Sequence, residues 1–304
     1  AANGAMRRLP VFFLLILALV CPAALPEPAW AGARPACAGP VAVAGARVVR
    51  VEQNGMLALA NGRAVVLEGV RMPLSQPGQS GDREAAEVLS ALHGLTADRT
   101  VTFTAVPPRE DRYGRLRVQA FVGDVWLQAA LLERGLARVA ISPDRSECAT
   151  ALLAAEARGR GGKAGIWGGG PASPYRVRDP WQLRGTAGTF QVVEGRVTNV
   201  GRASSGRAFI DFGADWPQGF SATVAPADRR RFRGFDLNHL VAHRVRVREC
   251  PADVPKDSLD FRGDQRSLTS DPCPGRLTIY QPHHEVDKAC GFIHRIDWND
   301  VGVG

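Results

Sequence analysis

The sequence predicts a mainly β protein with several helices, divided into two parts by a linker. Short apolar runs bounded by turn residues predict the strands. Three longer segments with apolar residues at helical spacing predict helices. Gly, Pro and Ser gather between two periodic regions, and we place the linker at 169–185.

The first part is expected to cover residues 41–168. It opens with a β-rich run at 41–51, and Asn61-Gly62 between two apolar stretches is a strong hairpin signal. The first helix is expected to stop at Gly94, and the second to begin at Asp124 as N-cap and close at Gly135. The remaining elements are expected in this order: helix 81–95, strand 100–106, strand 115–122, helix 124–136 and helix 146–167.

The second part is expected to cover residues 186–249. Two strands flank the turn Ser204-Ser205-Gly206, and a third strand, a short basic helix at 227–235 and a closing strand follow. Several short strands with one intervening helix predict a small antiparallel barrel. Periodicity fades in 250–304, which reads as an irregular tail or as the product of a frameshift.

The N-terminus predicts an exported protein. Met6 and two arginines precede an apolar run at 11–20, and Ala29-Trp30-Ala31 is a small-x-small cleavage site. The apolar run is about half as long as a membrane-spanning helix. We therefore expect residues 1–31 to be a signal peptide, with a mis-called start before Met6, and a mature protein that is periplasmic or secreted and not integral to the membrane. An uncleaved anchor is the alternative.

Six cysteines are present, and Cys21 would leave with the signal peptide. An exported chain can hold disulfides. Cys37 lies just before the first part and Cys148 lies near the start of its last helix, so these two are the candidate pair. The other cysteines leave one odd thiol, and their spacing matches no zinc site. They are Cys250, Cys273 and Cys290.

The formal net charge is +8. Such a charge suits nucleic acid or another anionic polymer as partner. A GC-rich genome, which favours arginine, is the other explanation. No nucleophilic triad, phosphate loop or dinucleotide fingerprint accompanies the charge.

Four stretches resemble the staphylococcal-nuclease (thermonuclease) family across about residues 47–167. They are LANGRAVVLEGV (59–70), DRYGRLRVQAFV (111–122), LLERGLARV (131–139) and AAEARGRGGKAGIW (154–167). The resemblance implies a five-stranded OB barrel packed with three helices, and calcium-dependent cleavage of DNA and RNA. The second part resembles an extra OB-like module found in exported members.

The resemblance also places the family's catalytic residues, and most are replaced. Gly55 and Arg71 stand where the family has its two metal carboxylates, Leu74 replaces the general-base glutamate, and Val66 replaces an arginine. Only Arg115 remains, as a phosphate-binding candidate. A hard cation needs oxygen ligands, and an arginine in its place repels it. We therefore expect no metal or cofactor, and calcium only if the protein is a divergent nuclease.

Three functions follow from this pattern. The first is a non-catalytic module that binds nucleic acid or an envelope component. The second is a divergent phosphodiesterase that keeps Arg115 and uses carboxylates such as Glu52, Glu68 or Asp82. The third is an envelope scaffold with protein or glycan partners. The candidate nucleic-acid-binding residues are Arg71, Arg112, Tyr113, Arg229, Arg230, Arg231 and Arg233.

Each candidate also has a simpler explanation. Arg115 would equally suit an ion pair with Glu110 or Asp111 at a strand end. The basic segment around Arg231 would equally suit a solvated helix with one packed phenylalanine.

Overall fold

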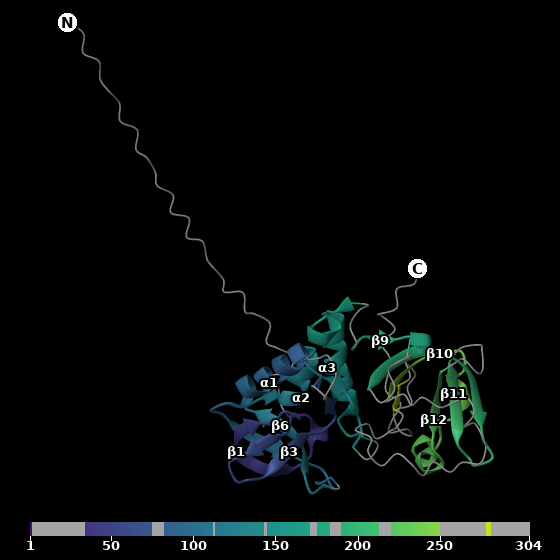
Figure 1. Ribbon diagram of the computed structural model, residues 1–304, viewed down its shortest axis with the longest axis horizontal. Coiled ribbons are helices and arrows are strands. Elements are labelled where there is room, and N and C mark those ends of the chain that lie inside the picture. Colours follow the sequence, from purple (N-terminus) through teal and green to yellow (C-terminus); the bar gives the residue numbers. More distant parts are fainter. Residues whose placement is uncertain are drawn as a thin grey trace.

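A computed structural model of the chain shows two packed parts (Figure 1). It describes residues 1, 34–74, 82–111, 113–142, 145–170, 175–182, 190–212, 220–249 and 278–280. The expected signal peptide, much of the linker, nearly all of the tail and the cysteines other than Cys37 and Cys148 lie outside these residues. We call residues 34–170 the barrel domain and the described residues from 175 to 280 the half-barrel.

The barrel domain is a closed five-stranded barrel. Its strands follow the order β3-β2-β1-β5-β6, and a parallel pairing of β3 with β6 joins the two edges. The Asn61-Gly62 turn lies between β2 and β3, as its hairpin signal predicts. The strands are β1 (Val41–Val51), β2 (Leu57–Leu59), β3 (Ala64–Leu67), β5 (Thr100–Thr104) and β6 (Leu116–Val122).

Strand β1 serves both halves of the barrel because it bends. Its N-terminal end pairs with β5 and its C-terminal end pairs with β2. The register shifts between Val43 and Ala46, where Gly45 has φ of +59°. A glycine adopts this left-handed conformation without steric cost, so one strand can turn from one side of the barrel to the other.

Three α-helices pack on the barrel: α1 (Asp82–Thr96), α2 (Leu127–Glu133) and α3 (Ala149–Gly161). Together with the barrel they confirm the predicted fold class. A two-stranded sheet of β4 (Val70–Arg71) and β8 (Arg138–Val139) and a 3₁₀-helix at Gly165–Trp167 complete the domain. None of the described helices is long and apolar enough to cross a membrane.

The ends of all three predicted helices need correction. The third helix, expected at 146–167, is shorter: α3 ends at Gly161, and the separate 3₁₀-helix at Gly165–Trp167 follows it. Helix α1 continues through Gly94 to Thr96, whose hydroxyl donates to the carbonyl of Leu92, and the left-handed residue comes later at Asp98. Asp124 does not cap α2, because the next two residues form β7 (Val125–Trp126), which pairs with the end of β6. Helix α2 begins at Leu127 and is almost wholly buried.

Helix α3 is held against the rest of the domain in two ways. A disulfide joins Cys148, directly before the helix, to Cys37 ahead of β1. Further along, Gly159 lies against α2, and an added Cβ there would come within 2.3 Å of the Leu132 carbonyl oxygen. Only a glycine allows this close approach of the two helices.

The half-barrel is a sheet in the order β12-β11-β10-β13-β14, with β9 parallel to β10. Within the described residues β12 and β14 do not pair, so the predicted second barrel is present as half a barrel. Its core is separate from that of the barrel domain. Its strands are β9 (Val177–Arg178), β10 (Gln191–Arg202), β11 (Ala208–Phe212), β12 (Phe220–Val224), β13 (Arg244–Glu249) and β14 (Thr278–Tyr280).

Short 3₁₀-helices link the strands of the half-barrel. They lie at Pro180–Gln182, Pro226–Phe232 and Leu237–Leu240. The middle one is the predicted basic helix, and it is a 3₁₀-helix rather than an α-helix.

The two parts meet along α3, which lies on the side of the barrel domain that faces the second sheet (Figure 1). Arg248 of β13 reaches across and pairs with Glu156 of α3, and its Nη1 also donates to the Val139 carbonyl oxygen over 3.2 Å. The two parts are therefore joined by a buried ion pair.

Candidate functional site

The tight turn between β5 and β6 is organised by one carboxylate. Asp111 Oδ1 accepts hydrogen bonds from the backbone N–H of Tyr113 at 2.9 Å and of Arg115 at 3.0 Å. Gly114 supplies the left-handed residue, with φ of +72°. A side-chain oxygen that binds the backbone of the following residues is a common way to fix a turn. The Asp-Arg-Tyr-Gly-Arg motif thus has a structural role of its own.

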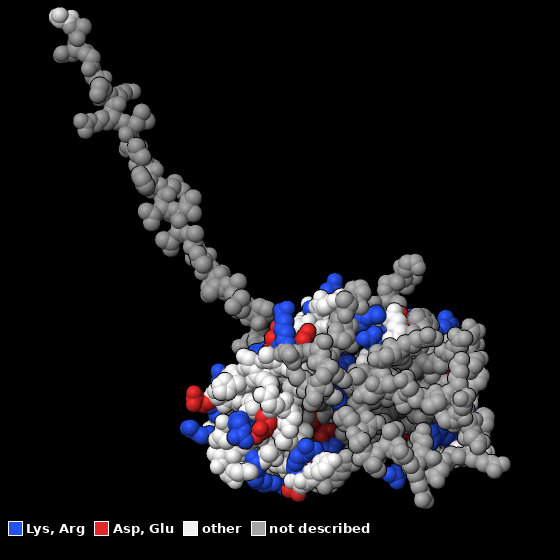
Figure 2. All heavy atoms as spheres, viewed as in Figure 1, with Lys and Arg blue, Asp and Glu red and all other residues white. Residues whose placement is uncertain are grey.

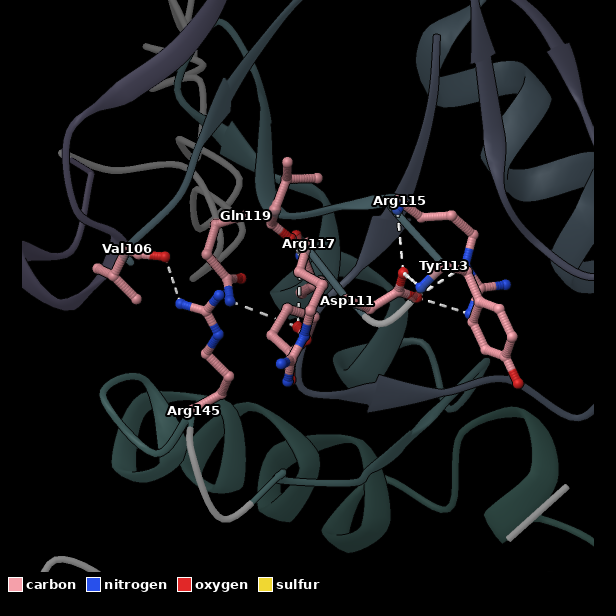
Figure 3. A network of polar contacts seen from close by, with 10 residues as sticks. Val106, Asp111, Tyr113, Arg115, Arg117, Gln119 and Arg145 are labelled. Atoms are coloured by element: carbon pink, nitrogen blue, oxygen red, sulfur yellow. Dashed lines mark hydrogen bonds and ion pairs between the residues drawn. The ribbon is translucent and has the colours of Figure 1, made fainter. Parts of the chain in front are cut away.

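Arg115 is held by the same carboxylate. Its Nε lies 2.7 Å from Asp111 Oδ2, so the ion pair with Asp111, rather than one with Glu110, is the one that forms (Figure 3). Partial burial acts to raise the pKa of Asp111, but the hydrogen bonds from Arg115 and from the Tyr113 backbone outweigh it, and the pKa lies below its ordinary value. The guanidinium is therefore positioned in advance of any ligand.

An exposed aromatic ring lies beside this guanidinium. Arg115 Cζ is 4.8 Å from the centroid of the Tyr113 ring, and Tyr113 is 65% exposed. Figure 3 shows the ring pointing away from the strand. A fixed cation and an exposed aromatic face therefore lie together at the surface of the barrel.

The corner on the other side of Arg115 is apolar. Arg115 Nη1 lies 3.7 Å from the Met56 sulfur. At Gly55, whose φ is +78°, an added Cβ would come within 2.4 Å of Met72 Cε and 2.9 Å of Leu74 Cδ1. A thioether and a leucine methyl thus occupy the space beside Gly55. No carboxylate fits there unless these side chains move.

Arg71 is turned away toward the half-barrel. It pairs across β4 and β8 with Arg138, and its Cζ lies 5.7 Å from the centroid of the Phe190 ring. Burial lowers the pKa of Arg71. Arg138 lies 4.9 Å from the same ring. The arginine expected at a metal position therefore packs, with a second arginine, against an aromatic residue ahead of β10.

Two of the three carboxylates named as replacements for the missing ligands are paired with arginines. Glu68 accepts from Arg117 Nε at 2.6 Å, and Glu52 accepts from Arg50 Nη2 at 2.6 Å. The side chain of Asp82 lies outside the described residues. Among the residues that the structure describes, no group of three or more His, Cys, Asp or Glu could hold a metal ion. The residues present around Arg115 do not fit a calcium ion.

In the second basic segment the described arginines are exposed and the two phenylalanines are partly buried. Arg229, Arg230 and Arg233 are exposed on and just after the 3₁₀-helix at Pro226–Phe232. Phe232 and Phe235 pack against the core of the half-barrel. The side chain of Arg231 and all of Arg112 are outside the described residues. The structure therefore brings together Tyr113 and Arg115, while the arginines of this segment lie in the other part of the protein.

Residues 64–169 match the family model described as staphylococcal nuclease homologue. This part of the chain belongs to the staphylococcal nuclease family. The match covers β3 to the end of the barrel domain and confirms the resemblance that the motifs predict; it does not extend to the half-barrel. No curated protein matches the chain.

The sequence shows that the metal carboxylates and the general base of the staphylococcal nuclease family are replaced, but it does not show which side chains fill the space that they would occupy. The sequence places Met56 in the turn with Gly55 and Met72 at a position where the family has a small residue, but only the structure shows that the Met56 side chain contacts Arg115 and that the Met72 side chain faces Gly55. Sequence reasoning also missed the ion pair of Glu156 with Arg248. The alternation Arg-Val-Arg-Val-Arg at 244–248 was the available signal, since a strand with arginines on one face needs partners there.

Proposed function

We propose that the barrel domain binds nucleic acid without cleaving it. The observation that carries this proposal is the apolar corner beside Arg115. Cleavage in the way of this family requires a cation held by oxygen ligands and a carboxylate that activates water. Gly55, Met72 and Leu74 supply neither. Binding requires only the guanidinium of Arg115 and the ring of Tyr113, and both remain.

Tyr113 and Arg115 suit single-stranded nucleic acid. A base can stack on an exposed ring, which contributes about 1–3 kcal/mol per base, and a guanidinium can hold the adjoining phosphate through two hydrogen bonds. The Asp111 ion pair limits the motion of Arg115, so less conformational entropy is lost on binding. On the face shown in Figure 2, basic and acidic side chains are interspersed over the barrel domain. Local contacts at Tyr113 therefore support the proposal better than a broad basic patch.

The test is to measure binding of fluorescent single-stranded DNA and RNA to the purified chain, in calcium and in chelator. We expect binding that is equal in both, that weakens as salt is raised, and that leaves the strand intact. Tyr113→Ala should weaken it about tenfold, while Tyr113→Phe, which keeps the ring, should not. Arg83→Ala is the matched control, because Arg83 is exposed and pairs with Glu87 on α1.

Two results would contradict the proposal. Calcium-dependent cleavage that disappears in Arg115→Ala would identify a divergent nuclease with an unfamiliar set of ligands. Absence of salt-sensitive binding to either nucleic acid would favour an envelope protein or a glycan as the partner.

We also propose that the protein acts outside the cytoplasm, in the periplasm or after secretion. The disulfide between Cys37 and Cys148 supports this, because such bonds persist in oxidising compartments. Cell fractionation with thiol labelling tests it. Recovery of the protein in the cytoplasm with both thiols free would contradict it.

A further inference from the structure

The two faces of β13 have different chemistry. Val245 and Val247 are fully buried in the core of the half-barrel. Successive side chains of a strand point to opposite faces, so Arg244, Arg246 and Arg248 share the other face. Their side chains are 46%, 15% and 1% exposed in that order. The row of arginines thus runs from the surface into the contact with α3.

A pocket of about 420 Å³ opens along this row, between the end of α3 and strands β9, β10 and β13. Among the residues that the structure describes, four arginines and two carboxylates line it, a net charge of +2. The charged residues are Arg160, Arg178, Arg244, Arg246, Asp179 and Glu194. Its volume is within the range of small-molecule sites, but its charged lining is unlike that of an apolar ligand site.

Two carboxylates of this region are held by other arginines. Glu194, which lines the pocket, accepts from Arg246 Nε at 2.8 Å and from Arg244 Nη2 at 3.1 Å. Glu156, which lies behind the pocket on α3, accepts from Arg248 and from the backbone N–H of Val139. Neither accepts a hydrogen bond from Nη1 of Arg160, the arginine that α3 contributes to the pocket.

That residue, Arg160, has a buried Nη1 without a hydrogen-bond partner among the described residues. Burial, followed by the charge of Arg246, lowers the pKa of Arg160 to about 10. On the opposite wall, the hydrogen bonds of Arg178 include one to the Gln191 side chain at 2.8 Å and one to the Gln182 carbonyl oxygen at 3.3 Å. An anion between the walls would supply the acceptor that Nη1 lacks.

We propose that this pocket binds a phosphate monoester dianion. The net charge of +2 on the described lining residues suits a dianion, and guanidinium groups that approach from α3, β9 and β13 suit a tetrahedral group better than a planar carboxylate. The pocket is larger than a free phosphate, so it has room for the organic group of an ester beside the phosphate group. The site lies outside the part of the chain that matches the nuclease family, apart from the end of α3. It does not depend on binding by Tyr113 and Arg115.

The test is calorimetric titration of the full purified chain at neutral pH with inorganic phosphate, a 5′-mononucleotide and succinate. We expect saturable binding of both phosphates and binding of succinate at least tenfold weaker. A mononucleotide that binds more tightly than phosphate identifies a nucleotide source, and equal affinity identifies the phosphate group alone; either supports the site. Absence of saturable phosphate binding, or equal binding of succinate, overturns it.

Two variants of α3 distinguish binding in the pocket from nonspecific attraction of phosphate by the positive charge of the protein. Arg160→Met should weaken phosphate binding about tenfold or more, as loss of a charged hydrogen bond predicts. Arg158→Met should change it less than twofold, because Arg158 pairs with Glu133 away from the pocket. If both variants weaken binding equally, the proposal fails.

Two further measurements keep the result interpretable. Arg160→Lys keeps the charge and loses the guanidinium fork, so it should weaken binding several-fold with an unchanged melting temperature even if Arg160→Met does not fold. Tyr113→Ala should leave phosphate binding unchanged. A loss in Tyr113→Ala that equals the loss in the Arg160 variants would overturn a separate site.

Discussion

Arg248 and Glu156 form an ion pair in which both side chains are only 1% exposed, and the two residues lie 92 positions apart in the chain. Glu156 belongs to α3 of the barrel domain and Arg248 to β13 of the half-barrel. Glu156 also accepts from the backbone N–H of Val139 at 2.7 Å. The pair therefore ties one helix, a short strand beside it and the second sheet together.

Removing one partner of this ion pair should lower the free energy of unfolding more than removing both partners. Arg248→Met leaves the Glu156 carboxylate buried without its counter-charge, and we expect a loss of about 3–5 kcal/mol in the free energy of unfolding. Adding Glu156→Gln should restore part of this loss. Chemical denaturation measures both. Arg244→Met is the control, because that side chain is half exposed and should cost less than about 1 kcal/mol. Equal losses in all three proteins would contradict the role given to this pair.

Stability should fall in acid. Burial acts to raise the pKa of Glu156 and of Glu194, but their arginine partners outweigh it, and both pKa values lie below the ordinary 4.5. A carboxylate with a depressed pKa contributes stability above its ordinary pKa, and that contribution is lost as pH falls through the folded value. We expect the free energy of unfolding to be level from pH 7 to about 5 and to drop below pH 4.5.

The acid slope can be assigned to Glu156 by substitution. Glu156→Gln cannot take up the proton, so the drop in its free energy of unfolding below pH 4.5 should be shallower than that of the unsubstituted chain. An identical slope in both proteins would show that other carboxylates set the pH dependence.

The disulfide should make a large contribution to stability. Cys37 and Cys148 are 111 residues apart, so their bond restricts a long segment of the unfolded chain. Chain entropy predicts a stabilisation of about 4–5 kcal/mol. Reduction, or the double substitution Cys37→Ala and Cys148→Ala, should lower the free energy of unfolding by this order. An unchanged midpoint of denaturation after complete reduction would contradict the prediction.

Gly55→Ala should destabilise the barrel domain through a clash at the apolar corner. Its Cβ would meet Met72 and Leu74, whereas at Gly62, with nearly the same φ, an added Cβ meets nothing within 4 Å. Gly62→Ala therefore measures left-handed backbone strain alone, about 1–2 kcal/mol. We expect Gly55→Ala to cost about 1–3 kcal/mol more. Similar losses at both glycines would mean that the corner is not packed as described.

The sequence predicted elements that depend on local signals. Asn61-Gly62 marked a hairpin and Gly135 marked the end of α2, because each supplies a left-handed residue that other residues avoid. The predictions at Gly94 and Asp124 failed because a local signal can be overridden. A helix can continue through a glycine, and the pairing of β7 with β6 overrides a good N-cap residue.

The candidate site was predicted only in outline. The motif identified Arg115, and the replaced residues indicated that calcium ligands were missing. What replaced them required tertiary contacts: Met56 lies between β1 and β2, Met72 and Leu74 follow β4, and the two segments meet only in the folded barrel. The pocket at Arg160 could not be predicted from the sequence, because α3, β9 and β13 are separate segments that come together only in the folded protein.

The alternation of valine and arginine along β13 determines both the register of this strand in its sheet and the contact of its arginines with α3. Shifting this strand by a single residue would turn its arginines into the core of the half-barrel and its valines toward α3. The same slip would leave Glu156 without a counter-charge. Correct pairing of one strand within its own sheet is therefore also the condition for joining the two halves of the protein, so an insertion or deletion within 244–248 should be far more harmful than one in the turn at Gly206.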